Sequence, residues 1–205
     1  MAINEKLREY IERSILPQYE NFDAGHGTDH ALAVIEKSME LAERFDVNAD
    51  MVYAVAACHD IGLRFGREGH ELSSGRLIRL DGALREFFTA DQIETMAQAA
   101  EDHRASSKHE PRSLYGLIVS EADRQLDPAT VLRRAVQYGL ANYPELDEAG
   151  QLDRAFAHVT EKYGEGGYLK LRLESARNAA ALAEIRRILN DRAEFDRICR
   201  GFMRG

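Results

Sequence analysis

The sequence has few cysteines, few prolines and no long apolar run, and each shortage argues against a class of protein. Among 205 residues there are two cysteines, Cys58 and Cys199, too few for a disulfide framework, which favours a reducing, cytoplasmic setting. Four prolines and 15 glycines argue against a collagen-like or low-complexity chain. No stretch approaches the roughly 20 apolar residues of a membrane span, and the N-terminal segment lacks the apolar core of a signal peptide. We therefore expect no membrane partner.

Basic residues are also fewer than acidic ones. Lysine and arginine number 27 against 35 aspartates and glutamates, which gives a net charge of −8. Because proteins grip duplex nucleic acid through clustered basic side chains, we expect no such partner. A small phosphorylated ligand is still compatible with this balance, since a few basic groups in a cleft would hold it. The 44% of hydrophobic and 30% of charged residues are typical of a globular chain, and a disordered one would be poorer in apolar residues.

Apolar residues recur at spacings of three and four along most of the chain, which is the pattern of amphipathic helices. Thr28 or Asp29 provides a natural N-cap for one helix, and Thr89 with Gln92 fits a capping box that opens another. No segment alternates like a strand over more than a few residues, so the sequence predicts an all-α fold. The predicted helices cover residues 3–16, 29–45, 49–61, 90–103, 113–126, a segment that starts at Pro128, 169–189 and 192–203.

The segment 49–61 is the most apolar of these predicted helices. Its apolar residues lie on every face, which indicates burial on every side. A buried strand is the rival interpretation, but the alanines and the length favour a helix. Polar residues 104–112 predict a loop, and the glycine-rich residues 163–168 predict another break.

The chain carries no Ser/Gly-rich linker. We expect a helical core over residues 1–126 and a C-terminal helical extension over 127–205, packed together as one domain. The additional C-terminal helices would also suit a homodimer.

Histidines and aspartates interrupt the apolar faces of several predicted helices. His59 and Asp60 follow the most apolar helix, and a buried carboxylate needs a cation beside it. His30 lies next to an apolar stripe near the start of its helix, and Asp123 lies on a mostly apolar helix. Two imidazoles and two carboxylates suit a divalent ion such as Mn²⁺, Fe²⁺, Co²⁺, Ni²⁺ or Mg²⁺, whereas a closed zinc site more often uses cysteine.

The order and context of these residues resemble the HD-domain metal-dependent phosphohydrolases. GHGTDHALAV is similar to the first motif of that family, AACHDIG to its second and VSEADR to its last, and the resemblance covers residues 26 to about 126. It implies an HD-domain-like helical bundle with additional C-terminal helices. It also implies that the metal ligands are His30, His59, Asp60 and Asp123, and that phosphate esters of nucleotides and related compounds are hydrolysed.

Two more histidines fall between the second and last motifs. By the resemblance, His70 and His103 could hold a second metal ion with Asp60 as the bridge, or contact or protonate the substrate. His70 could equally be a solvated loop residue beside Gly69, and His103 could satisfy the carbonyls at the end of its helix. The sequence leaves one or two metal ions per chain open. His26, between two glycines, is expected to be a loop residue, or one that orients the site from outside the ligands.

Several basic residues near these motifs could bind the substrate phosphate, although each alone is more often a surface charge. They are Arg64, Arg67, Arg104, Lys108 and Arg124.

The expected reaction is hydrolysis of a phosphate ester or phosphoanhydride of a small metabolite, with a nucleotide favoured, by water that the metal activates. Two alternatives stay open: a di-iron oxygenase with the same fold, and a non-catalytic metal-bearing helical module that binds a ligand.

Overall fold

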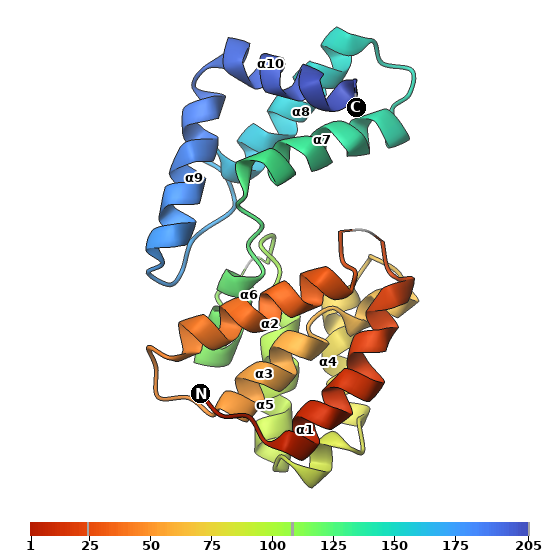
Figure 1. Cartoon of the computed structure of the whole chain (residues 1–205), viewed down its shortest axis with the longest axis vertical. Coiled ribbons are helices and arrows are strands. Elements are labelled where there is room, and N and C mark those ends of the chain that lie inside the picture. The colour runs from red at the N-terminus through yellow and green to blue at the C-terminus, as the bar shows by residue number, and fades with distance from the viewer. Residues whose placement is uncertain (24, 108, 205) are drawn as a thin grey trace. The chain divides into compact units, whose positions relative to one another are not determined.

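The described part of the chain, residues 1–23, 25–107 and 109–204 of a computed structural model, consists of helices, turns and loops without a strand (Figure 1). This confirms the all-α class. The chain divides into two compact units, Met1–Asp123 and Arg124–Gly205, each with its own packing. The sequence had suggested a division after residue 126, and that the two parts pack as one domain stays a prediction. None of the described helices is long and apolar enough to cross a bilayer.

The first unit begins with a continuous helical segment that changes its winding. An α-helix is followed directly by a π-helical turn and then by a 3₁₀ stretch that contains Pro17, so the single α-helix predicted over residues 3–16 is only partly correct. The helices of this unit are α1 (Glu5–Tyr10), π-helix Ile11–Ile15, 3₁₀ Leu16–Asn21, α2 (Thr28–Ala42), α3 (Ala49–Cys58), 3₁₀ Ile61–Phe65, α4 (His70–Leu80), 3₁₀ Leu84–Glu86, α5 (Ala90–Glu101) and α6 (Leu114–Ala122).

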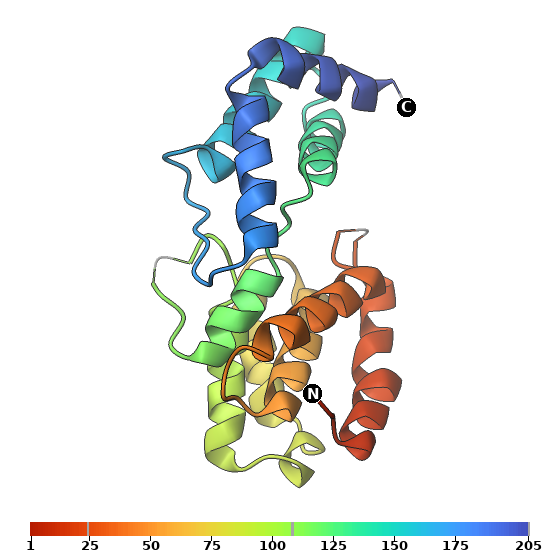
Figure 2. The same ribbon diagram turned by 60° about the vertical axis from the view of Figure 1, so that its left-hand side comes forward.

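Helix α3 lies at the centre of the first unit. All its residues from Met51 to Cys58 are buried, which confirms the interpretation of the most apolar segment as a buried helix. Helices α2, α5 and α6 pack against it, and α6 also lies beside α2 (Figures 1 and 2). Each large apolar side chain that is fully buried here contributes about 1.5–3 kcal/mol, so the apolar composition of α3 explains its central position.

The helix caps agree with the sequence in part. The capping box of Thr89 and Gln92 is present at the start of α5, and Asp127 caps the helix that Pro128 opens. Neither Thr28 nor Asp29 caps α2, because the N-cap is Gly27 and Thr28 is already the first helical residue.

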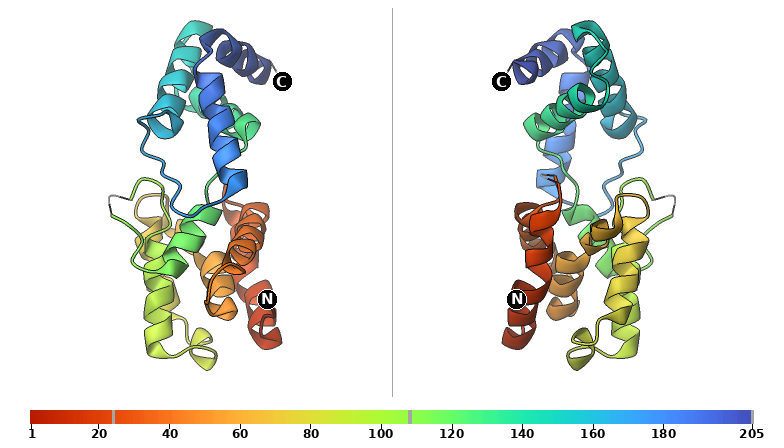
Figure 3. Two further views of the ribbon diagram at one scale, coloured as in Figure 1. Left: turned by 90° about the vertical axis from the view of Figure 1, so that its left-hand side faces the viewer. Right: turned by 90° about the vertical axis from the view of Figure 1, so that its right-hand side faces the viewer.

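Helix α4 is not among the predicted helices, and it is held by two close backbone approaches. A Cβ on Gly62 would lie 2.1 Å from the His70 carbonyl oxygen, so only glycine lets the 3₁₀ turn after α3 approach the start of α4. The Gly62 amide donates to Ser74 Oγ at 2.9 Å. A Cβ on Gly75 would lie 2.9 Å from the Ala97 carbonyl oxygen of α5, so glycine also lets α4 pack closely along α5 (Figure 3). The first contact carries His70 towards the end of α3.

The second unit contains the helices α7 (Pro128–Asn142), α8 (Glu148–Tyr163), α9 (Ala176–Leu189) and α10 (Arg192–Met203). Helix α8 is not among the predicted helices. The helix predicted over residues 169–189 begins only at Ala176, after the Ser175 cap, because the loop that starts in the predicted glycine-rich break runs further. The core of this unit is apolar and includes Leu132, Val136, Leu152, Ile185 and Phe195.

Candidate metal centre

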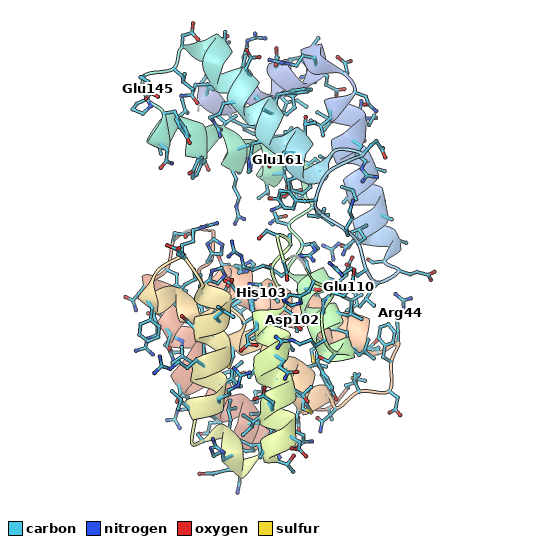
Figure 4. All side chains as sticks on the ribbon, turned by 180° about the vertical axis from the view of Figure 1, so that it is seen from behind. Arg44, Asp102, His103, Glu110, Glu145 and Glu161 are labelled. Carbon is cyan, nitrogen blue, oxygen red and sulfur yellow. The ribbon has the colours of Figure 1, made fainter. Side chains whose placement is uncertain are left out.

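Six candidate side chains converge at one end of the first unit. His59 is the C-cap of α3, with Asp60 directly after it, and both are buried. His30 lies in the first turn of α2, and Asp123 is the C-cap of α6. His70 is the first residue of α4, and His103 follows the end of α5, where Figure 4 labels it.

One side of Asp60 faces the residues of the three motifs. Its Oδ2 lies 3.4 Å from His59 Nε2 and 3.6 Å from His30 Nε2, and the two Nε2 atoms are 3.3 Å apart. Asp123 Oδ1 is 3.2 Å from His30 Nε2 and 3.9 Å from His59 Nε2. These four side chains therefore surround one small volume.

The other side of Asp60 faces the two additional histidines. Asp60 Oδ1 lies 3.1 Å from His70 Nε2 and 3.3 Å from His103 Nε2. His70 is buried at the start of α4, so the alternative of a solvated loop residue is wrong. Asp60 is shared by two groups of residues that could hold a metal ion, one with His30 and His59 and one with His70 and His103.

The histidine tautomers are set by the backbone. Nδ1 of His59 lies 2.7 Å from the Ala56 carbonyl, that of His70 lies 2.8 Å from the Arg67 carbonyl, and that of His103 lies 2.6 Å from the Ala100 carbonyl. Because a carbonyl oxygen only accepts, each Nδ1 carries the proton and donates, so the Nε2 lone pair of a neutral ring faces Asp60. For His103, the expected contact with a carbonyl at the end of the helix is therefore present through Nδ1, and Nε2 is left for the cluster.

Lone pairs that face a carboxylate repel it unless a cation lies between them. Asp60 Oδ1 is buried and accepts no aligned hydrogen bond from the described residues, although two ring nitrogens are close to it. This is the arrangement expected of donors directed at a shared point rather than at one another. The residues therefore fit a divalent cation, both in their chemistry and in the direction of their donor atoms.

The electrostatics of the cluster favour positive charge. Burial on its own would lower the pKa of His30, but the carboxylates of Asp123 and Asp60 outweigh it and raise that pKa to about 9. The pKa values of His59 and His70 are also raised, because Asp60 outweighs their burial. Burial would raise the pKa of Asp60, but the positive charge that the neighbouring His59 can carry outweighs burial and holds that pKa well below its usual value.

Tyr19 supports the cluster, and no pattern in the sequence points to it. Its buried hydroxyl donates to the Ala57 carbonyl at 2.8 Å and accepts from the Asp60 amide at 3.3 Å, so it fixes the turn that presents Asp60. The two partners lie 38 and 41 residues away along the chain, a separation that leaves no pattern in the sequence. His26 lies beside the cluster, with its ring centroid 5.7 Å from that of His30 and its Nδ1 2.8 Å from Asp23 Oδ1.

The candidate phosphate contacts are spread more widely. Arg104 Nη1 lies 3.2 Å from Glu71 Oε2, so its guanidinium is tied to the residue after His70. The Arg64 guanidinium contacts Gln18, and that of Arg67 contacts Asp23 at 3.6 Å, so these two side-chain contacts lie outside the six side chains. Arg124 follows Asp123 as the first residue of the second unit, and Lys108 lies outside the described residues.

Comparison with known families is consistent with this geometry. The family model for the HD domain matches residues 27–125, a range that contains all six side chains of the cluster. These residues are an HD domain. HD domains bind divalent metals, and this one has histidine and aspartate groups that could hold a metal ion. The family match and the cluster together indicate a metal-dependent hydrolase.

The fold of the HD domain also occurs in a solved structure. The chain is similar to a predicted HD superfamily hydrolase from an uncultured Thermotogales bacterium, with a TM-score of 0.53 and 23% sequence identity. The match covers 78% of this chain and 89% of the other, so the likeness supports the fold beyond the matched HD residues. A search of curated proteins found no significant match.

Proposed function

We propose that the protein is a metal-dependent phosphohydrolase that acts on a small phosphorylated metabolite, with a nucleotide as the favoured substrate. The observation that carries the proposal is the position of Asp60 between two pairs of histidines. His30, His59 and Asp123 would hold one divalent ion together with Asp60 Oδ2. His70 and His103 would hold a second ion together with Asp60 Oδ1.

The ligand types favour Mn²⁺, Fe²⁺, Co²⁺, Ni²⁺ or Mg²⁺, because every donor is an imidazole nitrogen or a carboxylate oxygen. Divalent ions bound there would lower the pKa of a coordinated water and neutralise charge on the phosphoryl oxygens. The protein would hold His59, His70 and His103 in the ligating tautomer through three backbone carbonyls, and Tyr19 would fix the backbone of Asp60.

The substrate would approach from the side of His30 and Asp123. Their side chains are 17% and 22% exposed, whereas those of the other four residues are between 0% and 8% exposed. Arg104, which is 38% exposed, would supply positive charge for the phosphate from the side of His70 and His103. The preference for a nucleotide rests on the resemblance of the three motifs to phosphohydrolases that act on nucleotides and related compounds.

The test is to strip the purified protein with a chelator and reload it with each of the five metal ions separately. Each form is then incubated with nucleoside mono-, di- and triphosphates, dinucleotides and sugar phosphates, and released phosphate and pyrophosphate are measured. The proposal expects release that disappears on stripping and returns with at least one metal. A protein that binds no metal and releases no phosphate under any of these conditions would overturn it.

Oxygen uptake and melting temperature, measured on the same metal-loaded forms, separate the two alternatives. A shared carboxylate between two histidine pairs is also compatible with a di-iron centre that uses oxygen. That reading predicts oxygen uptake by the iron-loaded form and no phosphate release. A non-catalytic module predicts bound metal and a higher melting temperature without turnover of any compound in the panel.

A further inference from the structure

A buried carboxylate lies directly before His103 and is not one of the six side chains. Asp102 is the C-cap of α5, and its side chain is 0% exposed (Figure 4). A carboxylate removed from water is costly unless a cation and hydrogen-bond donors compensate it. Asp102 therefore needs a cationic partner at the end of α5.

That partner is Arg112, ten residues further along the chain. The Arg112 amide donates to Asp102 Oδ2 at 2.7 Å, its Nη2 donates to Oδ1 at 2.7 Å, and its Nε lies 3.1 Å from both oxygens. The guanidinium and the backbone amide of Arg112 thus donate hydrogen bonds to both carboxylate oxygens of Asp102. Such forked, charge-assisted contacts are directional as well as strong. The loop that leaves α5 at Asp102 is closed by Arg112 at the same point.

Arg112 also fixes the last turn of α5. Its Nη2 donates to Glu101 Oε2 at 2.7 Å and to the Gln98 carbonyl at 3.2 Å. A cation at the C-terminal end of a helix is favourable because the unpaired carbonyls there carry partial negative charge. Arg79 of α4 binds Glu101 from the other side, so the end of α5 is held from both directions.

His103 is the first residue beyond this anchored end. It follows the C-cap of α5, and its Nε2 must still lie within 3.3 Å of Asp60 Oδ1. Within the loop, Arg104 is tied to Glu71. Besides the hydrogen bond of the ring's own Nδ1 to the Ala100 carbonyl, His103 has next to it along the chain the buried contact of Asp102 with Arg112.

We propose that Asp102 and Arg112 form a clamp that positions His103 for the second divalent ion. Arg112 is then a positioning residue that acts through Asp102 and His103 without touching the ion. This rests on the proposed function, because it requires a second ion between Asp60, His70 and His103. Loss of the clamp should weaken the binding of the second metal ion selectively, because His30, His59 and Asp123 lie on other elements.

The experiment titrates chelator-stripped protein with Mn²⁺ alone and follows both binding steps by calorimetry and by the electron paramagnetic resonance of free Mn²⁺. The wild type is expected to bind two ions. In Arg112→Gln the dissociation constant of the second step should rise by about 10-fold or more, and that of the first should change little. Arg112→Lys keeps the charge but not the fork, so it should restore little of the loss.

The matched control is Arg187→Gln in the second unit. Arg187 also binds two carboxylates, those of Glu184 and Glu194, and both of these contacts lie within the second unit. This variant should leave both binding steps unchanged. Asp102→Asn, measured in the same way, carries the test if Arg112→Gln does not fold.

The outcomes separate the clamp from the function on which it rests. A folded clamp variant whose second dissociation constant matches that of the wild type overturns the clamp while the two-metal proposal stands. Equal weakening of both steps would also overturn it, because it indicates a general loss of structure. A wild-type protein that binds fewer than two ions overturns the metal pair and the clamp together.

Discussion

The two units of the chain bury different kinds of side chain. Among the described residues, the buried polar side chains of the second unit are Gln151 and Arg124, which directly follows Asp123. The first unit buries a larger set, namely Ser38, His59, Asp60, His70, Ser74, Asp102, His103, Ser120 and Glu121.

This difference shows that helix packing alone does not require the buried charge of the first unit. The second unit builds an apolar core and keeps ion pairs such as that of Arg200 with Glu148 at its surface. Because buried charges are costly and have to be compensated, their concentration around Asp60 points to chemistry rather than to stability. Variants in the two units should therefore change different properties.

The largest effect is expected for Asp60→Asn. The amide offers one neutral oxygen in place of two charged ones, so both ions should be lost. Phosphate release should fall by about 10⁴-fold, which corresponds to about 5 kcal/mol of transition-state stabilisation. Metal analysis and the phosphate assay measure this. The control is Asp153→Asn, which removes an exposed carboxylate of the second unit and should change neither. Retained metal and turnover in Asp60→Asn would break the comparison.

Phe195→Ala should lower the stability of the second unit and leave metal binding unchanged. Phe195 is fully buried in the second unit and contacts Phe156 edge to face with ring centroids 5.1 Å apart. Its truncation should lower the free energy of unfolding of this unit by about 3–5 kcal/mol, because a cavity is left behind. Denaturant unfolding measures the loss, and metal analysis should find an unchanged content. Loss of metal from the folded variant would show that the two units do not separate in this way.

Tyr19→Phe sharpens the comparison within the first unit. It removes one hydroxyl with almost no change in volume and leaves the Ala57 carbonyl and the Asp60 amide without this partner. We expect a loss of about 1–3 kcal/mol in unfolding free energy, together with weaker binding of Mn²⁺. Chemical denaturation and Mn²⁺ titration measure the two effects. If stability fell while Mn²⁺ affinity did not, Tyr19 would support only the fold.

The smallest effect is expected for Arg200→Gln. Its ion pair with Glu148, at 2.7 Å, joins side chains that are 41% and 54% exposed. Exposed pairs contribute little, so the unfolding free energy should change by less than about 1 kcal/mol, and metal binding should not change. Thermal unfolding of the variant beside the wild type is sufficient. A large loss would mean that surface charge supports the second unit more than its apolar core suggests.

The sequence predicted the parts of the fold that depend on local pattern. Helix α3 was recognisable from its unbroken apolar run, and α5 from its apolar spacing and the Thr89 capping box. Helix α4 was not recognisable, because its buried face includes Ser74 and Gly75 and its N-terminus has no side-chain cap. What holds α4 is the close approach of Gly62 and Gly75 to other elements, which depends on tertiary structure.

The candidate site divides in the same way. Four of the six residues lie in three recognisable motifs, and the structure brings them together. They are His30, His59, Asp60 and Asp123. His70 and His103 could be named but not assigned from the sequence, because their burial depends on α4 and on the loop after α5. Tyr19 and Arg112 were missed altogether, since they act through hydrogen bonds to residues distant in sequence or across a loop.

The most direct test of the two-sided site around Asp60 is the anomalous X-ray signal of crystals grown with Mn²⁺. We predict two peaks that flank this carboxylate, one beside His30, His59 and Asp123 and the other beside His70 and His103. A single peak would contradict the proposal of a second ion, and the absence of any peak at Asp60 would contradict the metal centre itself.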